Sequence, residues 1–185
     1  MKVFGIDPGS ERTGYGCIDT DGSRHVLVTC GAIATAPHAE FPEKLLTIHQ
    51  ALGRLLAEHR PDCVAVESVF YATNVRSALK LGHARGVALL AAVETGVPLF
   101  EYTPAEIKRA VVGYGRAEKH QVGEMVRVIL GLAEIPEPHD AADALAVAIC
   151  HVHASGGPVA ALVAEKPKAA RGAARTPKSW REYKP

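Results

Sequence analysis

Four acidic residues occur where a folded chain could gather their carboxylates for metal chemistry. Asp7 ends an apolar stretch and precedes a Pro-Gly turn, and Glu67 follows a continuously apolar run. Asp140 and Asp143 are three residues apart in a small, apolar segment, so on a helix they would share one face. Carboxylates crowded together repel one another, and a divalent cation between them removes that repulsion. Hard oxygen ligands with few imidazoles favour Mg²⁺ or Mn²⁺ over zinc.

Each of these acids also has a structural explanation when it is considered alone. An Asp before Pro-Gly, as at Asp7, commonly forms a turn, and Glu67 can pair with a basic side chain at the end of a strand. Asp140 can cap a helix N-terminus, where the helix dipole favours negative charge. Asp143 is harder to explain, because burying one unpaired acid among Ala and Leu costs free energy. Together the four predict a site for two divalent ions ~3.5–4 Å apart, which suits phosphodiester hydrolysis.

Basic and aromatic residues lie in segments that could contact a phosphodiester substrate. Four basic residues precede the last acidic pair: Lys108, Arg109, Arg116 and Lys119. They can neutralise phosphates, although a solvated basic face is an equally simple interpretation. The glycines at 113 and 115 could bring backbone N–H groups close to a phosphate. Phe70 and Tyr71 follow the second acid in a polar loop, where they could stack on an unpaired base or pack beneath the loop.

The elements that must position these residues follow a mixed pattern. Strands are predicted at residues 2–7, 13–20, 26–34, 63–67 and 98–102, with Asp21-Gly22 typical of a hairpin turn between the second and third. Helices are predicted between Pro42 and Pro61 and at residues 74–94, 104–112, 118–130 and 139–153. This order predicts an α/β fold, in which helices pack on a mixed sheet. Ligands gather at the carboxyl ends of strands, so Asp7 and Glu67 would share a cleft if their strands are neighbours.

Length and composition predict one globular domain with a basic tail. The chain has 185 residues, of which 48% are apolar and 22% charged. We expect a domain over residues 1–154 and a disordered tail over residues 155–185, which carries seven Lys/Arg against two Asp/Glu. Such a tail is either a solvated extension or a weak phosphate binder. No membrane segment or secretory signal is expected, and four scattered cysteines are typical of reduced thiols in a cytoplasmic protein.

Six short motifs run along the chain: GIDPG (5–9), TGYG (13–16), VESVF (66–70), SALKLG (77–82), VVGYGRAEK (111–119) and DAADALA (140–146). In this order and spacing they resemble the RuvC family of bacterial Holliday junction resolvases, over about residues 1–153. The resemblance implies a ribonuclease-H-like fold with a five-stranded sheet, three strands antiparallel and two parallel. It also implies a homodimer that cuts four-way DNA junctions by paired symmetric nicks, leaving 5′-phosphate and 3′-hydroxyl ends.

The same resemblance assigns roles by position. The family's metal-binding carboxylates correspond to Asp7, Glu67, Asp140 and Asp143, which implies two Mg²⁺ ions per subunit, with Mn²⁺ able to substitute. The basic residues at the scissile strand correspond to Lys108 and Lys119, and the base-stacking aromatic to Phe70. Some family members carry His at the position of Asp140, and here His139 is its neighbour. The branch-migration proteins RuvA and RuvB are implied as partners by the resemblance alone.

Other features leave alternatives open. Gly82 and Gly86 are four residues apart on a predicted helix and permit close approach of either the sheet or a second subunit. An actin-like or sugar-kinase-like ATPase also begins with a strand and an Asp-x-Gly turn. That architecture needs two such domains and a second phosphate loop, for which this chain is too short. A module that binds junctions without cutting them would gain nothing from four acids, which repel DNA.

Overall fold

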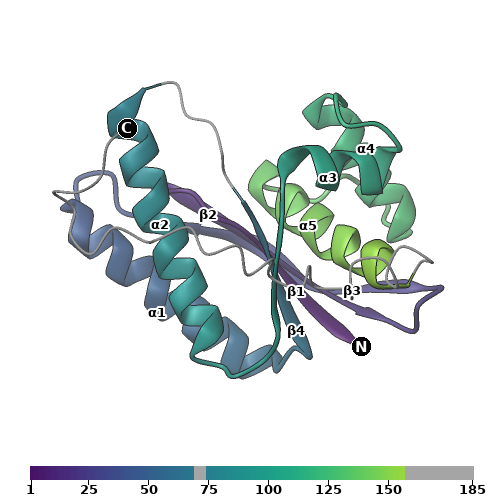
Figure 1. Cartoon of the computed structure of the whole chain (residues 1–185), viewed down its shortest axis with the longest axis horizontal. Helices are drawn as coiled ribbons and strands as arrows, with labels where there is room; N and C mark the ends of the chain where they lie inside the picture. The colour runs from purple at the N-terminus through teal and green to yellow at the C-terminus, as the bar shows by residue number, and fades with distance from the viewer. Residues whose placement is uncertain (69–73, 157–185) are drawn as a thin grey trace, which may run out of the picture.

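A computed structural model of the protein describes residues 1–68 and 74–156 (Figure 1). The strands there are β1 (Lys2–Asp7), β2 (Arg12–Thr20), β3 (His25–Ala34), β4 (Cys63–Glu67) and β5 (Leu99–Tyr102). The helices there are α1 (Phe41–His59), α2 (Val75–Val93), α3 (Pro104–Val112), α4 (Lys119–Ile129) and α5 (His139–Gly156). The predicted elements occur in the predicted order. Their ends differ slightly, most clearly in α5, which continues past His153.

The five strands form one mixed sheet in the order β3-β2-β1-β4-β5. β1 pairs antiparallel with β2, and β2 with β3, while β4 lies parallel to both β1 and β5. The turn between β2 and β3 is the predicted one: the Asp21 carboxylate accepts the backbone N–H of Ser23 and of Arg24, and Gly22 has a φ of +99°. Because β1 lies beside β4, the first two predicted acids end neighbouring strands.

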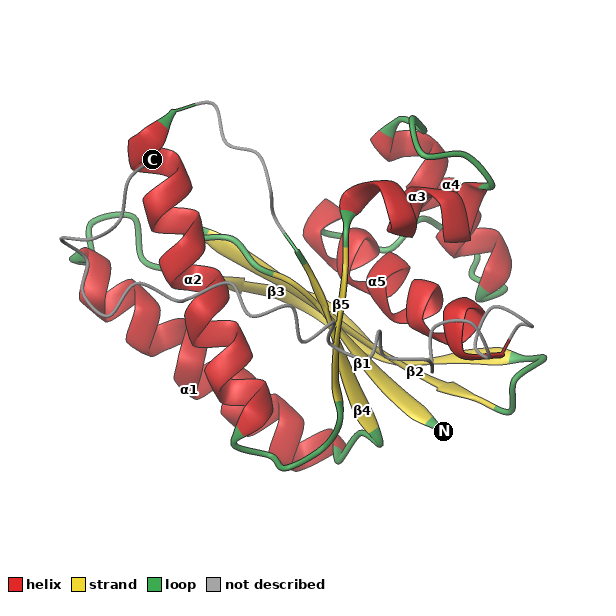
Figure 2. Ribbon diagram, viewed as in Figure 1, coloured by secondary structure: helices red, strands yellow, loops and turns green. Residues whose placement is uncertain are grey.

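Helices cover both faces of the sheet (Figure 2). The helices α1 and α2 lie on one face, and α5 lies on the other with α3 and α4 packed outside it. The strand β4 is buried on both faces, as its continuous apolar run predicts. Val64 and Val66 point into the core under α1 and α2, whereas Cys63 and Ala65 belong to the core around α5.

The helix α1 is amphipathic and well capped. A capping box joins Glu40 and Glu43 at its first turn, which satisfies N–H groups that have no partner within the helix. Ile48, Leu52 and Leu56 are spaced by four residues and fully buried, so they form the stripe that packs against the sheet. This packing fixes the N-terminal turn of α1 close to the loop that follows β1.

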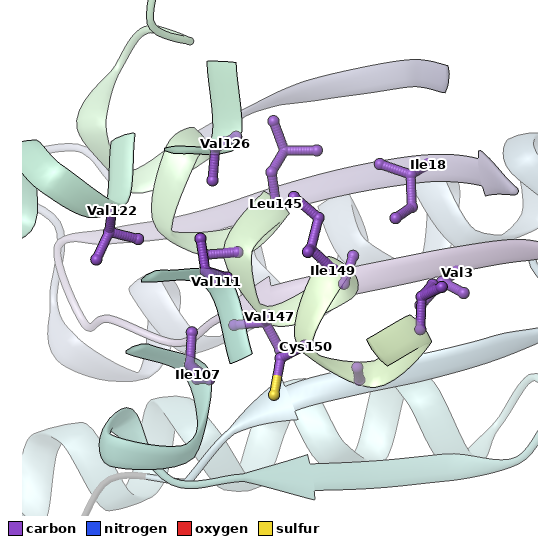
Figure 3. Packing of buried hydrophobic residues seen from close by; sticks show 14 of the residues in the cluster. Val3, Ile18, Ile107, Val111, Val122, Val126, Leu145, Val147, Ile149 and Cys150 are labelled. Atoms are coloured by element: carbon purple, nitrogen blue, oxygen red, sulfur yellow. The ribbon is translucent and has the colours of Figure 1, made fainter. Parts of the chain in front are cut away.

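The helix α5 is the centre of the second core. Figure 3 shows Leu145, Val147 and Ile149 on this helix among side chains from α3, α4 and the sheet, and all three are fully buried. No helix in residues 1–68 and 74–156 is long and apolar enough to cross a membrane. None of the four cysteines forms a disulfide, and all but the half-buried Cys30 are buried. The predicted tail lies outside the described residues, apart from Ser155 and Gly156 at the end of α5.

Candidate active site

Asp7 and Glu67 meet at the carboxyl ends of β1 and β4. The parallel register places Ile6 opposite Val66, so the two acids that follow share one edge of the sheet. Their carboxyl groups lie within hydrogen-bonding reach of each other. Burial, together with the nearby charge of Glu67, raises the pKa of Asp7 to about 9. Burial also raises the pKa of Glu67. Because the pKa of Asp7 is about 9, this carboxyl group keeps its proton at neutral pH.

Asp143 approaches this pair from the other core layer. Its negative charge raises the pKa of both Asp7 and Glu67, so the three carboxylates act on one another electrostatically. The Asp143 side chain is 22% exposed, and its Oδ2 accepts a hydrogen bond from Lys119 Nζ at 2.9 Å. The structure therefore brings these three acids near one another, and Lys119 lies against the same cluster.

Asp140 lies at the edge of the cluster. Its Oδ2 is 3.6 Å from Arg12 Nε at the start of β2. The helix α5 begins at His139, which is exposed, so Asp140 lies inside the first turn and does not occupy the cap position considered above. The charge of Asp140 still contributes to raising the pKa of Lys119, which places both acids of α5 near that ammonium group.

Glycines on the central strands allow α5 to bring its acids close. A Cβ atom on Gly5 would lie 2.1 Å from the carbonyl oxygen of Ala144, and one on Gly14 would lie 2.0 Å from that of Asp140. Real Cβ atoms do not approach backbone oxygens so closely, so only glycine fits at these positions. The helix backbone thus rests directly on the sheet backbone, beside the end of β1.

The predicted basic residues divide into two groups. Hydrogen bonding to Asp143 raises the pKa of Lys119, and the charges of the acids raise it further. Lys108 is near enough for its positive charge to act on Glu67, where it partly offsets the rise in pKa that burial causes. Arg109 and Arg116 are exposed, and no recorded contact in the described part of the chain joins either to the acids. Phe70 and Tyr71 lie outside the described residues, so their predicted stacking stays a prediction.

The donor set suits a hard cation, although the side chains do not yet surround one. Among residues 1–68 and 74–156, no three Asp, Glu, His or Cys side chains stand in position to hold a metal ion. The contacts of the acids explain why they do not surround an ion. Asp7 and Glu67 face each other, whereas Asp143 contacts Lys119 and Asp140 contacts Arg12. Three mutually repelling carboxylates with two raised pKa values nevertheless fit a divalent ion with oxygen ligands, which would replace the proton on Asp7.

Two features of the site were missed by sequence reasoning. Arg12 was not considered, yet it is the described cation nearest to the Asp140 carboxylate. In the sequence, Gly14 and Gly16 stand out only as parts of the TGYG motif, although they alternate along a strand. Glycine in the interior of a strand often marks the close approach of another backbone, and this signal could have identified the contact with α5.

Comparison with known proteins identifies the family. The sequence model described as "Crossover junction endodeoxyribonuclease RuvC" matches residues 3–151. The chain belongs to the RuvC family. A RuvC of Trichlorobacter lovleyi is 48% identical over 190 residues, covering all of both chains. A RuvC of Citrifermentans bemidjiense is 53% identical over 156 residues, covering 84% of this chain and 94% of that one.

Solved structures of the RuvC family agree in fold. Thermus thermophilus RuvC is 39% identical with a TM-score of 0.77, covering 84% of this chain and 95% of that one. The same protein in complex with a Holliday junction substrate is 36% identical with a TM-score of 0.78, covering 86% and 98%. These matches confirm the predicted ribonuclease-H-like fold and the nuclease class. They favour neither of the two alternatives, the ATPase and the non-cutting module.

Proposed function

We propose that this chain resolves Holliday junctions by metal-dependent hydrolysis at the site formed by its four acids. The observation that carries the proposal is the convergence of Asp7, Glu67 and Asp143, from β1, β4 and α5, beside the ammonium group of Lys119. T. thermophilus RuvC, which shares the fold at 36% identity, is known in complex with a Holliday junction substrate. That complex supports a four-way junction as the substrate here.

The acids would hold Mg²⁺ ions, two per subunit, and Mn²⁺ can take the same oxygen ligands. Asp7, Glu67, Asp140 and Asp143 would supply the oxygen ligands, and the metal charge would take the place of the proton that the raised pKa of Asp7 retains. Bound ions would supply an activated water and a counter-charge for the leaving oxygen. To hold them, the two acids of α5 must turn away from Arg12 and Lys119, which frees both cations for the DNA phosphates.

Lys119 and Lys108 then act on the scissile phosphate. Released from Asp143, Lys119 can donate to a phosphate oxygen as negative charge grows on it, and Lys108 lies on the Glu67 side of the same site. The water oxygen would form a bond to phosphorus as the bond from phosphorus to the 3′ oxygen breaks. The attacking water would lose one proton to solvent, and the 3′ oxygen would take one up. The products are a 3′-hydroxyl and a 5′-phosphate. Arg109 and Arg116, both exposed, would contact phosphates farther along the strand, and Phe70 with Tyr71 would stack on opened bases.

The helix α2 offers the surface for a second subunit. A groove of about 490 Å³ opens there between α1 and α2, lined by Leu45, Ala78, Leu79, Gly82, His83, Gly86, Val87 and Leu90. Cβ atoms on Gly82 and Gly86 would meet nothing within 4 Å, so neither glycine serves packing on the sheet. Leu79 and Leu90 are exposed apolar side chains on this face. A homodimer through α2 would bury them and present two active sites for paired nicks.

The resemblance further supports a cytoplasmic protein that works with RuvA and RuvB. A direct test of the function uses end-labelled four-way junctions and linear duplex of the same sequence, each with and without Mg²⁺. We expect paired, symmetric nicks in the junction alone and only with Mg²⁺, and no product from Asp7→Asn. Cleavage of the linear duplex at an equal rate, or cleavage by Asp7→Asn, would overturn the proposal.

A further inference from the structure

Lys44 is a buried cation that the proposed chemistry does not use. It lies in the first turn of α1, and its side chain is only 9% exposed. Its Nζ donates to Glu11 Oε2 at 2.6 Å, and the Glu11 side chain is itself 61% exposed. A buried ammonium group costs free energy unless it is paired, so this contact accounts for how the fold accommodates Lys44.

Glu11 belongs to the short loop that joins β1 to β2. Thr35, at the end of β3, donates its backbone N–H to the Glu11 carbonyl at 3.0 Å, and its hydroxyl approaches the same oxygen at 3.2 Å. The buried Thr13 hydroxyl donates to the Gly9 carbonyl at 2.8 Å. A Cβ on Gly9 would lie 2.1 Å from the carbonyl oxygen of Arg12, so the loop is tightly folded on itself.

The two ends of this loop carry groups of the proposed active site. Asp7 precedes the loop, and Arg12 follows it with its guanidinium group 3.6 Å from Asp140. The loop is held from outside by Lys44, which comes from the helix layer on the face of the sheet opposite α5 (Figure 2). The Lys44–Glu11 ion pair is therefore a link between α1 and the acids on both β1 and α5.

We propose that Lys44, acting through Glu11, is a positioning residue for the metal site. The ion pair fixes residues 8–12, so that the Asp7 carboxylate and the Arg12 guanidinium group face the acids of α5. This inference rests on the proposed function of that site. Lys44 is buried against Glu11, so its loss should weaken metal binding and turnover far more than it changes junction affinity.

The test compares full-length variants that each change one partner of an ion pair made by α1, either Lys44–Glu11 or His49–Glu94. Glu11→Gln removes the acid that faces Lys44. The matched control Glu94→Gln removes the acid 3.0 Å from His49, which lies on the same helix but away from the site. Lys44→Arg keeps the charge and Lys44→Met removes it. For each we would measure Mn²⁺ affinity by calorimetry, junction affinity, kcat for cleavage and the thermal unfolding midpoint.

For Glu11→Gln and Lys44→Met we expect weaker Mn²⁺ binding and lower kcat, each by about 10- to 100-fold, with a much smaller change in junction affinity. Lys44→Arg should restore both, and Glu94→Gln should match the wild type. If Lys44→Met does not fold, Glu11→Gln still decides the matter, because its side chain is largely exposed. Wild-type Mn²⁺ affinity and kcat in Glu11→Gln, with only a lower unfolding midpoint, would overturn the proposal. Mn²⁺ affinity is measured without DNA. A failure of the positioning proposal can therefore be told apart from a failure of the proposed function, which would appear as a wild-type protein that does not cut junctions.

Discussion

Gly14 lies against Asp140 so closely that a Cβ atom on the glycine would be 2.0 Å from the aspartate carbonyl oxygen. Gly14 is also the residue opposite Asp7 in the pairing of β2 with β1. One residue without a side chain thus separates an acid of the sheet from an acid of α5. The spacing of the proposed metal site is therefore set by contact between backbones, which rotamer changes cannot relax.

Gly14→Ala should displace the first turn of α5 and abolish cleavage, because the new methyl group cannot share space with the Asp140 backbone. We also expect a lower thermal unfolding midpoint. Gly53→Ala is the control, since a Cβ there meets nothing within 4 Å. It lies inside α1 and should stabilise the protein by about 0.5–1 kcal/mol without changing the cleavage rate. A Gly14→Ala variant that cuts at the wild-type rate would show that α5 can shift freely.

Asp143→Asn should stop cleavage and preserve or strengthen junction binding. The change removes a negative charge from a surface that must accept phosphates, and it removes one of the four carboxylates of the proposed metal site. Gel-shift affinity and single-turnover cleavage on the same labelled junction separate the two effects. Cleavage near the wild-type rate would remove Asp143 from the site.

Lys119→Ala should slow the chemical step more than it weakens binding. Its ammonium group lies against the acids and would stabilise charge that grows in the transition state, so we expect kcat to fall about 100-fold. Arg116→Ala is the comparison, because Arg116 is exposed and, among the described residues, forms no hydrogen bond or ion pair with the acids. This variant should mainly weaken junction binding. The slope of log affinity against log salt concentration should fall by about one, which corresponds to the loss of one phosphate contact. Equal losses of kcat and affinity in Lys119→Ala would make Lys119 a phosphate anchor only.

The stability of the protein in chelator should fall as the pH rises. The pKa of Asp7 is raised to about 9, chiefly by burial, so the folded chain holds a proton that the unfolded chain releases near pH 4. Its stabilising contribution is complete below about pH 4 and is lost as the pH rises towards 9. The thermal unfolding midpoint of Asp7→Asn should therefore rise relative to that of the wild type as the pH increases. Added Mg²⁺ should reduce this difference between the two midpoints. Parallel pH profiles would contradict the assignment.

Removing residues 157–185 should leave a folded, active enzyme. The helix α5 ends at Gly156, and the cores described above lie within residues 1–68 and 74–156. The removed segment is basic, so junction affinity should fall slightly and depend less on salt. Circular dichroism and cleavage of the labelled junction check this prediction. Loss of folding would show that the tail belongs to the domain.

Much of this protein could be predicted from sequence because local rules decide it. A continuous apolar run determines where Cys63–Glu67 lies, helical spacing determines where α1 lies, and the turn at Asp21 depends only on its neighbours. The four acids could be selected because each stands at the end of an apolar run or within one. The motifs were specific enough to indicate the family, which the comparisons confirm.

The tertiary structure alone decided which groups touch. Arg12 faces Asp140, Lys44 crosses to Glu11, and Asp143 turns to Lys119, and each pair is separated by at least 24 residues. Such contacts depend on how two helix layers pack against one sheet. No local sequence pattern specifies which residues from distant parts of the chain come into contact. Amino-acid order therefore determined the parts and their chemistry, whereas packing of glycine-bearing strands against α5 determined that the acids meet.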